Sequence, residues 1–173
     1  NLQSYYSLIN FYDEIYIKKI NKFKDNISFF GTYSKFVNPN NNTIKKTLNI
    51  LRKNKIISKF YSIKIKKKIP VFAGLGGGTS NAAAVIKFFI KKKINQKILN
   101  EFSRTLGSDL RLFFYNQGYL QGINSIIKSK KKFNFNIVLI YPKLKCSTKE
   151  IYSKFKNVSP KERYKIATFL NKK

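Results

Sequence analysis

The pattern of apolar and polar positions along the chain predicts strands and helices that alternate. Residues 60–66 alternate apolar and polar side chains and therefore predict a half-buried strand. Behind Asn42, a residue type typical of helix N-caps, Ile44, Leu48 and Leu51 follow at helical spacing. The same reasoning predicts helices from Asn81 to Phe89, over 96–106 and over 164–170, and a buried strand over 137–141 that ends at Pro142.

A glycine-rich segment joins the predicted strand to the helix at Asn81. Four of the five positions from Gly74 to Gly78 are glycine, so the backbone there can adopt positive φ and leave N–H groups free for anionic oxygens. Thr79 and Ser80 are predicted to cap the helix, whose positive dipole end would face the same ligand. This order of elements predicts a phosphate site, with a plain flexible loop before a helix as the alternative.

The spacing differs from both common phosphate-binding fingerprints. No Gly-Lys-Ser/Thr follows the segment at Walker A spacing, and the third glycine of a dinucleotide-binding loop is missing. The sequence therefore disfavours both a P-loop nucleotide site and a Rossmann dinucleotide-binding site.

The segment from Pro70 to Ala83 closely resembles the second motif of the GHMP kinases, Pro-x-x-x-Gly-Leu-Gly followed by Gly or Ser, Ser/Thr, Ser and small residues. With its glycine triplet and Asn81, it is most similar to the branch that phosphorylates the 2-hydroxyl of 4-diphosphocytidyl-2-C-methyl-D-erythritol in the non-mevalonate isoprenoid pathway. The homoserine and mevalonate branches, which differ in the acceptor, stay open as alternatives.

This resemblance implies ATP as the phosphoryl donor and Mg²⁺ as its metal ion, placed by the hydroxyl of Thr79 or Ser80. Asn42 resembles the start of the helix that contacts nucleotide in the family, although it is equally a plain helix cap. The nucleotide-binding residues that the resemblance implies are Asn42, Pro70, Val71, Phe72, Ala73, Gly74, Leu75, Gly76, Gly77, Gly78, Thr79 and Ser80.

A second segment, Leu106 to Asp109 followed by Leu110 and two phenylalanines, resembles the part of the family that carries the catalytic aspartate. The resemblance implies that Asp109 accepts or orients the proton of the acceptor hydroxyl. A turn role is the alternative, because Asp after Gly-Ser commonly bonds local N–H groups. Arg111 replaces a family proline, and two roles stay open for it: a charge near the phosphates, or a charge that lowers the pKa of Asp109.

The resemblance also implies an α+β, two-layer fold like the second domain of ribosomal protein S5 over residues 1–142. Residues 143–173 would begin a ferredoxin-like C-terminal domain. Gly118 and Gly122 match a hairpin of the family, and Asp13 to Ile15 matches the entry of a strand. The family's first and third motifs, including a lysine that works beside the aspartate, have no counterpart in this chain, so we expect an internal fragment with negligible activity alone.

The charge of the chain is +29, with 36 Lys and Arg against 7 Asp and Glu. Such a charge ordinarily suggests a polyanionic partner, and a basic RNA-binding module is the alternative function, using aromatic residues such as Tyr115, Tyr119, Phe133 and Phe135. However, the abundant Lys, Asn, Ile, Phe and Tyr all have codons of A and T alone. We therefore predict that the lysine runs 66–68, 91–93 and 130–132 are solvated turns, and that the partner is a small molecule rather than nucleic acid.

The remaining composition excludes several kinds of site. The chain has no histidine and only one cysteine, Cys146, which excludes imidazole bases, histidine metal sites and a disulfide within it. No apolar run reaches the length of a membrane span, and we expect a cytoplasmic protein without a membrane partner. The sequence does not indicate an oligomeric state.

Overall fold

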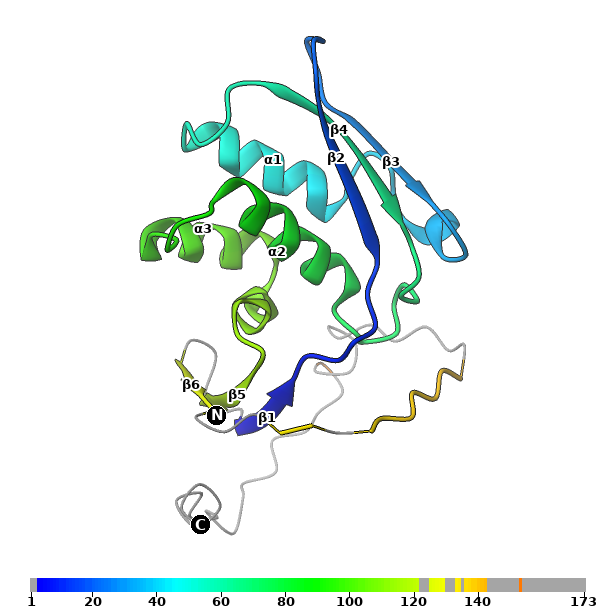
Figure 1. Cartoon of the computed structure of the whole chain (residues 1–173), viewed down its shortest axis with the longest axis vertical. Helices are drawn as coiled ribbons and strands as arrows, with labels where there is room; N and C mark the ends of the chain where they lie inside the picture. Colours follow the sequence, from blue (N-terminus) through cyan, green and yellow to red (C-terminus); the bar gives the residue numbers. More distant parts are fainter. Residues whose placement is uncertain (1–2, 122–124, 130–132, 135, 143–152, 154–173) are drawn as a thin grey trace.

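The computed structural model describes residues 3–121, 125–129, 133–134, 136–142 and 153. Helices and two small sheets share this part of the chain, which confirms the mixed α and β fold class (Figure 1). The elements are β1 (Gln3–Ser7), β2 (Glu14–Ile20), β3 (Asn26–Phe30), the 3₁₀ helix η1 (Ser34–Phe36), α1 (Thr43–Lys53), β4 (Phe60–Lys66), α2 (Gly77–Phe89), α3 (Gln96–Leu106), the 3₁₀ helix η2 (Ser108–Phe114), β5 (Gln117–Gln121) and β6 (Ser125–Lys128).

The larger sheet has the order β2-β4-β3, with β4 antiparallel to β2 and parallel to β3. Ile63 at the centre of β4 pairs with Ile17 of β2 and Ile27 of β3, so apolar residues of all three strands lie in one row. The three α-helices lie on one side of this sheet (Figure 1). The alternation in residues 60–66 thus turns Ile63 and Ile65 toward the helices, as the sequence predicted.

The hydrophobic core lies between this sheet and the helices. Residue spacing decides which side chains enter it, because positions three and four apart share one face of a helix. Burial of a side chain of this size stabilises the fold by about 1.5–3 kcal/mol. The most deeply buried side chains are Ile44, Leu48 and Leu51 of α1, Ile63 and Ile65 of β4, Val85 and Ile86 of α2, Phe102 of α3 and Leu110 of η2.

The second sheet has the order β1-β5-β6, and each neighbouring pair is antiparallel. The β5 and β6 pair confirms the predicted hairpin. Gly118 lies in β5, where an added Cβ would come within 2.7 Å of the Ile127 carbonyl oxygen, whereas Gly122 is outside the described residues.

The start of α2 differs from the prediction. The helix begins at Gly77 rather than Asn81, its N-cap is Gly76, and no side chain caps it. Thr79 and Ser80 therefore lie in the first turn of the helix and do not cap it. Glycine is a weak helix former, but here tertiary contacts set the boundary and override local propensity.

The buried strand predicted over residues 137–141 is also wrong. These residues have no regular structure, and Val138 and Ile140 are 88% and 84% exposed. An apolar run becomes a buried strand only when a neighbouring strand and a covering layer are present, and no described strand pairs with this run. The predicted helix 164–170, the segment 143–152 and Cys146 lie outside the described residues, and the division at residue 142 stays a prediction.

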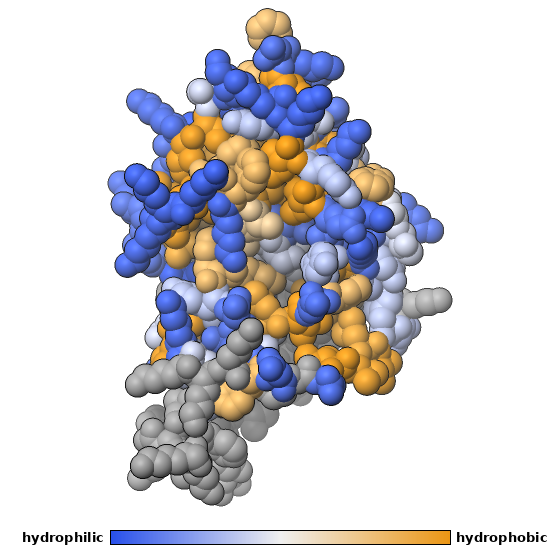
Figure 2. All heavy atoms as spheres, viewed as in Figure 1, coloured by the Kyte–Doolittle hydropathy of each residue, from blue (hydrophilic) through white to orange (hydrophobic). Residues whose placement is uncertain are grey.

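Hydrophilic side chains are spread over the face shown in Figure 2, with apolar surface exposed between them. The hydrophilic side chains described on that face do not form one continuous patch. No helix in the described part of the chain is both long enough and apolar enough to cross a bilayer.

Candidate functional site

A cleft of about 610 Å³ lies where the N-terminal ends of α1 and α2 meet the glycine-rich segment and η2. It brings together parts of the chain that are far apart in sequence. The residues that line it are Phe29, Phe36, Val37, Asn38, Asn41, Asn42, Thr43, Lys46, Lys67, every residue from Pro70 to Thr79, Asn81 and Asp109.

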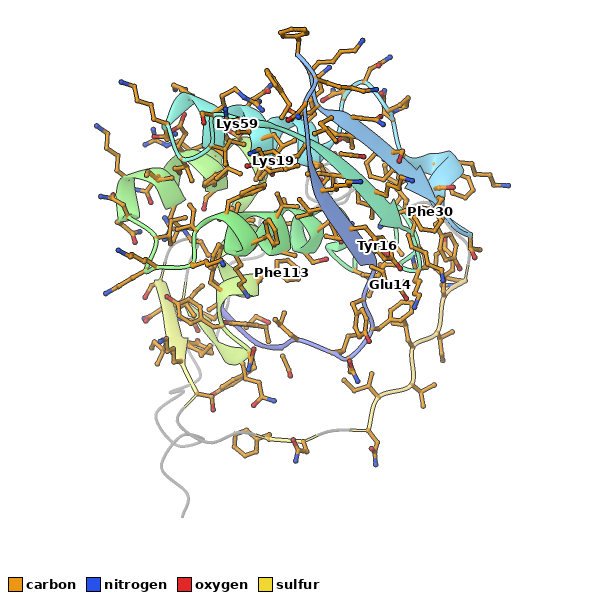
Figure 3. All side chains as sticks on the ribbon, turned by 45° about the horizontal axis from the view of Figure 1, so that its top comes forward. Glu14, Tyr16, Lys19, Phe30, Lys59 and Phe113 are labelled. Atoms are coloured by element: carbon orange, nitrogen blue, oxygen red, sulfur yellow. The ribbon has the colours of Figure 1, made fainter. Side chains whose placement is uncertain are left out.

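The glycine-rich segment forms one wall of the cleft with an irregular backbone. Gly74 and Gly76 have φ of 73° and 64°, in the left-handed region that glycine adopts without a steric penalty. Gly76 also lies against Phe113, since an added Cβ would come within 3.0 Å of the Phe113 Cζ; Figure 3 shows Phe113 beside α2. Phe72 has a positive φ of 63° although it is not glycine, so the loop stores some backbone strain.

The N-terminal ends of α1 and α2 are fixed beside each other by a hydrogen bond. The Thr43 hydroxyl donates to the Gly78 carbonyl oxygen at 2.9 Å. Neither helix has an acidic residue in its first turn, so no negative charge there compensates the two positive dipole ends that border the cleft. Such an arrangement favours an anionic ligand, because free N–H groups and two dipoles act on the same space.

Asn42 is the N-cap of α1, as predicted. Its side-chain oxygen accepts a hydrogen bond from the Lys45 N–H at 2.9 Å, and its amide donates to the Pro39 carbonyl oxygen at 2.9 Å. These local bonds stabilise the start of α1, and Asn42 is also among the residues that line the cleft.

Thr79 and Ser80 differ in position. Thr79 lines the cleft, whereas Ser80 does not, and the Ser80 hydroxyl donates to the Gly77 carbonyl oxygen at 2.9 Å. Of the two residues that the sequence suggested for a metal ion, only Thr79 is among those that line the cleft. The described residues contain no group of three or more acidic, cysteine or histidine side chains that could hold a metal.

Asp109 also lines this cleft, from the first turn of η2. Gly107, with φ of 111°, ends α3 and turns the chain into η2, and the buried Leu110 anchors the turn in the core. Lys87 of α2 donates to the Phe113 carbonyl oxygen, and burial lowers the pKa of its amine. The aspartate and the glycine-rich segment, predicted separately, therefore face one space.

Comparisons with known proteins agree with this geometry. Residues 42–115 match the family described as "GHMP kinases N terminal domain". These residues run from the N-cap of α1 through the glycine-rich segment to the end of η2, and so include most of the cleft. The chain contains a GHMP kinase N-terminal domain.

Relatives extend the similarity beyond that domain. A Pelagibacter ubique protein named 4-diphosphocytidyl-2-C-methyl-D-erythritol kinase is 38% identical over 92% of this chain and 58% of its own length. A Ureaplasma parvum protein of the same name is 34% identical over 84% of this chain and 56% of its length. The chain thus spans little more than half of these relatives. A crystal structure titled as 4-(cytidine 5'-diphospho)-2C-methyl-D-erythritol kinase has a TM-score of 0.47 at 22% identity, covering 67% of this chain and 41% of that one.

Arg111 of the GHMP kinase domain points toward α3, and its effect on Asp109 stays a prediction. Its guanidinium donates to the Asn100 side-chain oxygen on α3, and Arg111 is not among the residues that line the cleft. The hydrogen bond instead ties η2, which carries Asp109, to α3.

Lys67 and Asp13 are functional candidates that sequence reasoning missed. Lys67 was predicted to be a solvated turn, but it is only 4% exposed and pairs with the buried carboxylate of Asp13. A signal was available: Ile63, Ile65 and Lys67 share the period-two face that points into the core. The prediction of a solvated lysine run was therefore wrong at this position. The run 130–132 lies outside the described residues.

One of the aromatic residues that the alternative RNA-binding function would use is not exposed. Tyr119 is buried in β5, with its ring centroid 4.9 Å from that of Tyr5 on β1. A buried ring cannot stack on a base, so Tyr119 does not belong to an exposed aromatic face. Phe135 lies outside the described residues.

Proposed function

We propose that this chain is the nucleotide-binding part of an ATP-dependent kinase that phosphorylates the 2-hydroxyl of 4-diphosphocytidyl-2-C-methyl-D-erythritol, a step of the non-mevalonate isoprenoid pathway. The observation that carries the proposal is the cleft itself, in which two helix N-termini and a glycine-rich loop face Asp109. The names of the bacterial relatives support the choice of acceptor.

The triphosphate of ATP would lie on the glycine-rich segment. Backbone N–H groups from Ala73 to Gly78 and the dipoles of α1 and α2 would neutralise its charge without acidic competitors in either first turn. Lys46, which lines the cleft, adds a cation to the same wall. Positioning and charge neutralisation supply most of the catalysis in phosphoryl transfer.

Mg²⁺ fits this site as an ion that arrives with the nucleotide. It usually binds through substrate phosphates, waters and one or two protein oxygens rather than a dedicated cage. The cleft offers the side chain of Thr79 as an oxygen ligand. Bound Mg²⁺ would neutralise phosphate charge. Ser80, the other hydroxyl that the sequence suggested, donates to the Gly77 carbonyl oxygen and is not among the residues that line the cleft.

In the transfer step, the acceptor hydroxyl oxygen forms a bond to the γ-phosphorus while the bond from that phosphorus to the bridging oxygen of ADP breaks. Asp109 accepts the hydroxyl proton. The products are ADP and the 2-phosphate of the acceptor. Because the chain spans little more than half of its relatives, the complete reaction belongs to the full-length protein.

The test is ADP release by the full-length gene product with ATP, Mg²⁺ and one acceptor at a time. We expect turnover with 4-diphosphocytidyl-2-C-methyl-D-erythritol and none with homoserine or mevalonate as matched alcohol acceptors. Turnover with homoserine or mevalonate alone would move the protein to another branch of the family. No turnover with any acceptor, combined with salt-sensitive binding of RNA, would reject the kinase proposal.

A further inference from the structure

Asp13 is the centre of a buried hydrogen-bond network behind the glycine-rich segment. Its Oδ1 accepts the backbone N–H groups of Lys68 and Ile69 at 2.7 and 2.8 Å. Its Oδ2 accepts from the ammonium of Lys67 and from the Asn81 amide, the latter at 2.8 Å. One carboxylate therefore joins the entry of β2, the turn after β4 and the first turns of α2.

Lys67 lies between this network and the cleft. Its side chain is 4% exposed, yet the residue is among those that line the cleft. A Cβ added to Gly77, the first residue of α2, would lie 3.5 Å from the Lys67 Nζ. The ammonium is therefore directly behind the helix end that borders the proposed phosphate site.

The position of this ammonium is unfavourable unless something compensates it. A cation at the positive end of a helix dipole is repelled, and a buried charge costs free energy unless it is paired. The Asp13 carboxylate supplies the compensation. Burial alone would raise the pKa of Asp13, but the hydrogen bonds from Ile69, Lys67, Asn81 and Lys68 lower it, so the carboxylate stays charged.

Asp13 in turn depends on Lys67, and this matters for an anionic ligand in the cleft. Without Lys67, the Asp13 carboxylate would be an uncompensated buried anion close to the place where phosphate binds, and two anions in a poorly solvated space repel strongly. Nearby alternatives do not replace Lys67: Lys68 pairs with Glu14, and Lys66 lies 3.9 Å from the same glutamate, on the exposed side of the strand.

We propose that Lys67 is a positioning residue for nucleotide binding: held by the Asp13 carboxylate, which Asn81 also binds, its ammonium cancels the Asp13 charge behind the first turn of α2 and keeps the cleft receptive to phosphate. This inference rests on the proposed function, and it assigns Lys67 no contact with the nucleotide.

The experiment uses the full-length gene product with ATP, and it measures KM for ATP, kcat, and ATP affinity by calorimetry. The variants are Lys67→Met, the double variant Asp13→Asn with Lys67→Met, and Lys66→Met as a matched loss of one lysine charge. We expect Lys67→Met to raise KM for ATP at least tenfold with less than a threefold change in kcat. The double variant should return KM to within threefold of the parent, and Lys66→Met should leave KM within twofold.

The double variant separates this role from others. If Lys67 touched the phosphate, removing Asp13 as well would not restore ATP affinity, and that result would overturn the proposal. An unchanged KM in a folded Lys67→Met protein would also overturn it. If Lys67→Met does not fold, the double variant decides, because it carries no unpaired charge. If the unmutated protein does not bind ATP, both the proposed function and this inference are rejected. If the unmutated protein and the Lys67 variants bind ATP equally well, only this inference is rejected.

Discussion

The Thr43 hydroxyl of α1 donates a hydrogen bond of 2.9 Å to the Gly78 carbonyl oxygen of α2. This bond connects the N-terminal ends of two helices that are 35 residues apart in sequence at that point. Because both helix ends border the cleft, we expect loss of this bond to affect ligand affinity more than folding.

Replacement of Thr43 by valine keeps the shape of the side chain and removes the hydroxyl. We expect ATP affinity of the full-length protein to fall about fivefold, corresponding to the ~1 kcal/mol that a hydrogen bond of this kind contributes. Thr43→Ser, which keeps the hydroxyl, is the control and should bind ATP like the parent. Equal affinity of the valine and serine variants would show that the bond does not organise the cleft.

Gly76 and Gly78 provide a matched pair within the glycine-rich segment. Gly76 has φ of 64°, and an added Cβ would lie 3.0 Å from Phe113, so Gly76→Ala is expected to lower the free energy of unfolding by about 1–3 kcal/mol. At Gly78 the nearest side-chain atom would be 3.5 Å away, an ordinary contact, and alanine is the better helix former. Gly78→Ala should therefore be neutral or stabilise the protein by about 0.5–1 kcal/mol. Urea unfolding followed by circular dichroism measures both, and a reversed order would contradict the backbone geometry.

Asp109 is expected to act in the transfer step and not in nucleotide binding. Asp109→Asn keeps the size of the side chain but cannot accept the hydroxyl proton, so kcat should fall about 10²- to 10⁴-fold. KM for ATP should change less than threefold. Glu101→Gln is the control, because Glu101 is a carboxylate on α3 that pairs with Lys53 outside the cleft. A kcat for Asp109→Asn equal to that of the control would exclude the base role.

The buried Asp13 makes stability depend on pH in the acid range. Its hydrogen bonds overcome the effect of burial and hold its pKa in the folded protein below the value of 3.8 for a free side chain. The stabilisation is therefore fully present above about pH 5 and is lost as the pH falls from about 4 through the folded pKa. We expect the free energy of unfolding, measured in urea between pH 7 and pH 3, to fall less steeply in the Asp13→Asn, Lys67→Met double variant than in the parent. Parallel acid slopes would mean that other carboxylates dominate.

Local patterns in the sequence identified the elements whose boundaries depend on local chemistry. The strand 60–66 and the helix 96–106 have the bounds that their periodicity predicted, and Asn42 caps α1 because its side chain reaches an N–H three residues ahead. The sequence could not place the start of α2, because Gly77 and Gly78 are weak helix formers and yet lie in the first turn, where the Gly78 carbonyl oxygen accepts the Thr43 hydroxyl. The prediction of a buried strand over 137–141 was wrong for a related reason, because a buried strand needs a neighbouring strand to pair with.

The sequence by itself determined the glycine-rich segment, Asp109, and their resemblance to the GHMP kinases, because these are properties of short contiguous motifs. Only the tertiary structure decided that both face one cleft, that Thr79 rather than Ser80 reaches it, and that Arg111 binds α3 instead. It also decided that Lys67, among the lysines of the described residues, is buried. Asp13 and Lys67 are 54 residues apart, and whether such a pair of charges meets depends on strand register and helix packing, which no local pattern specifies.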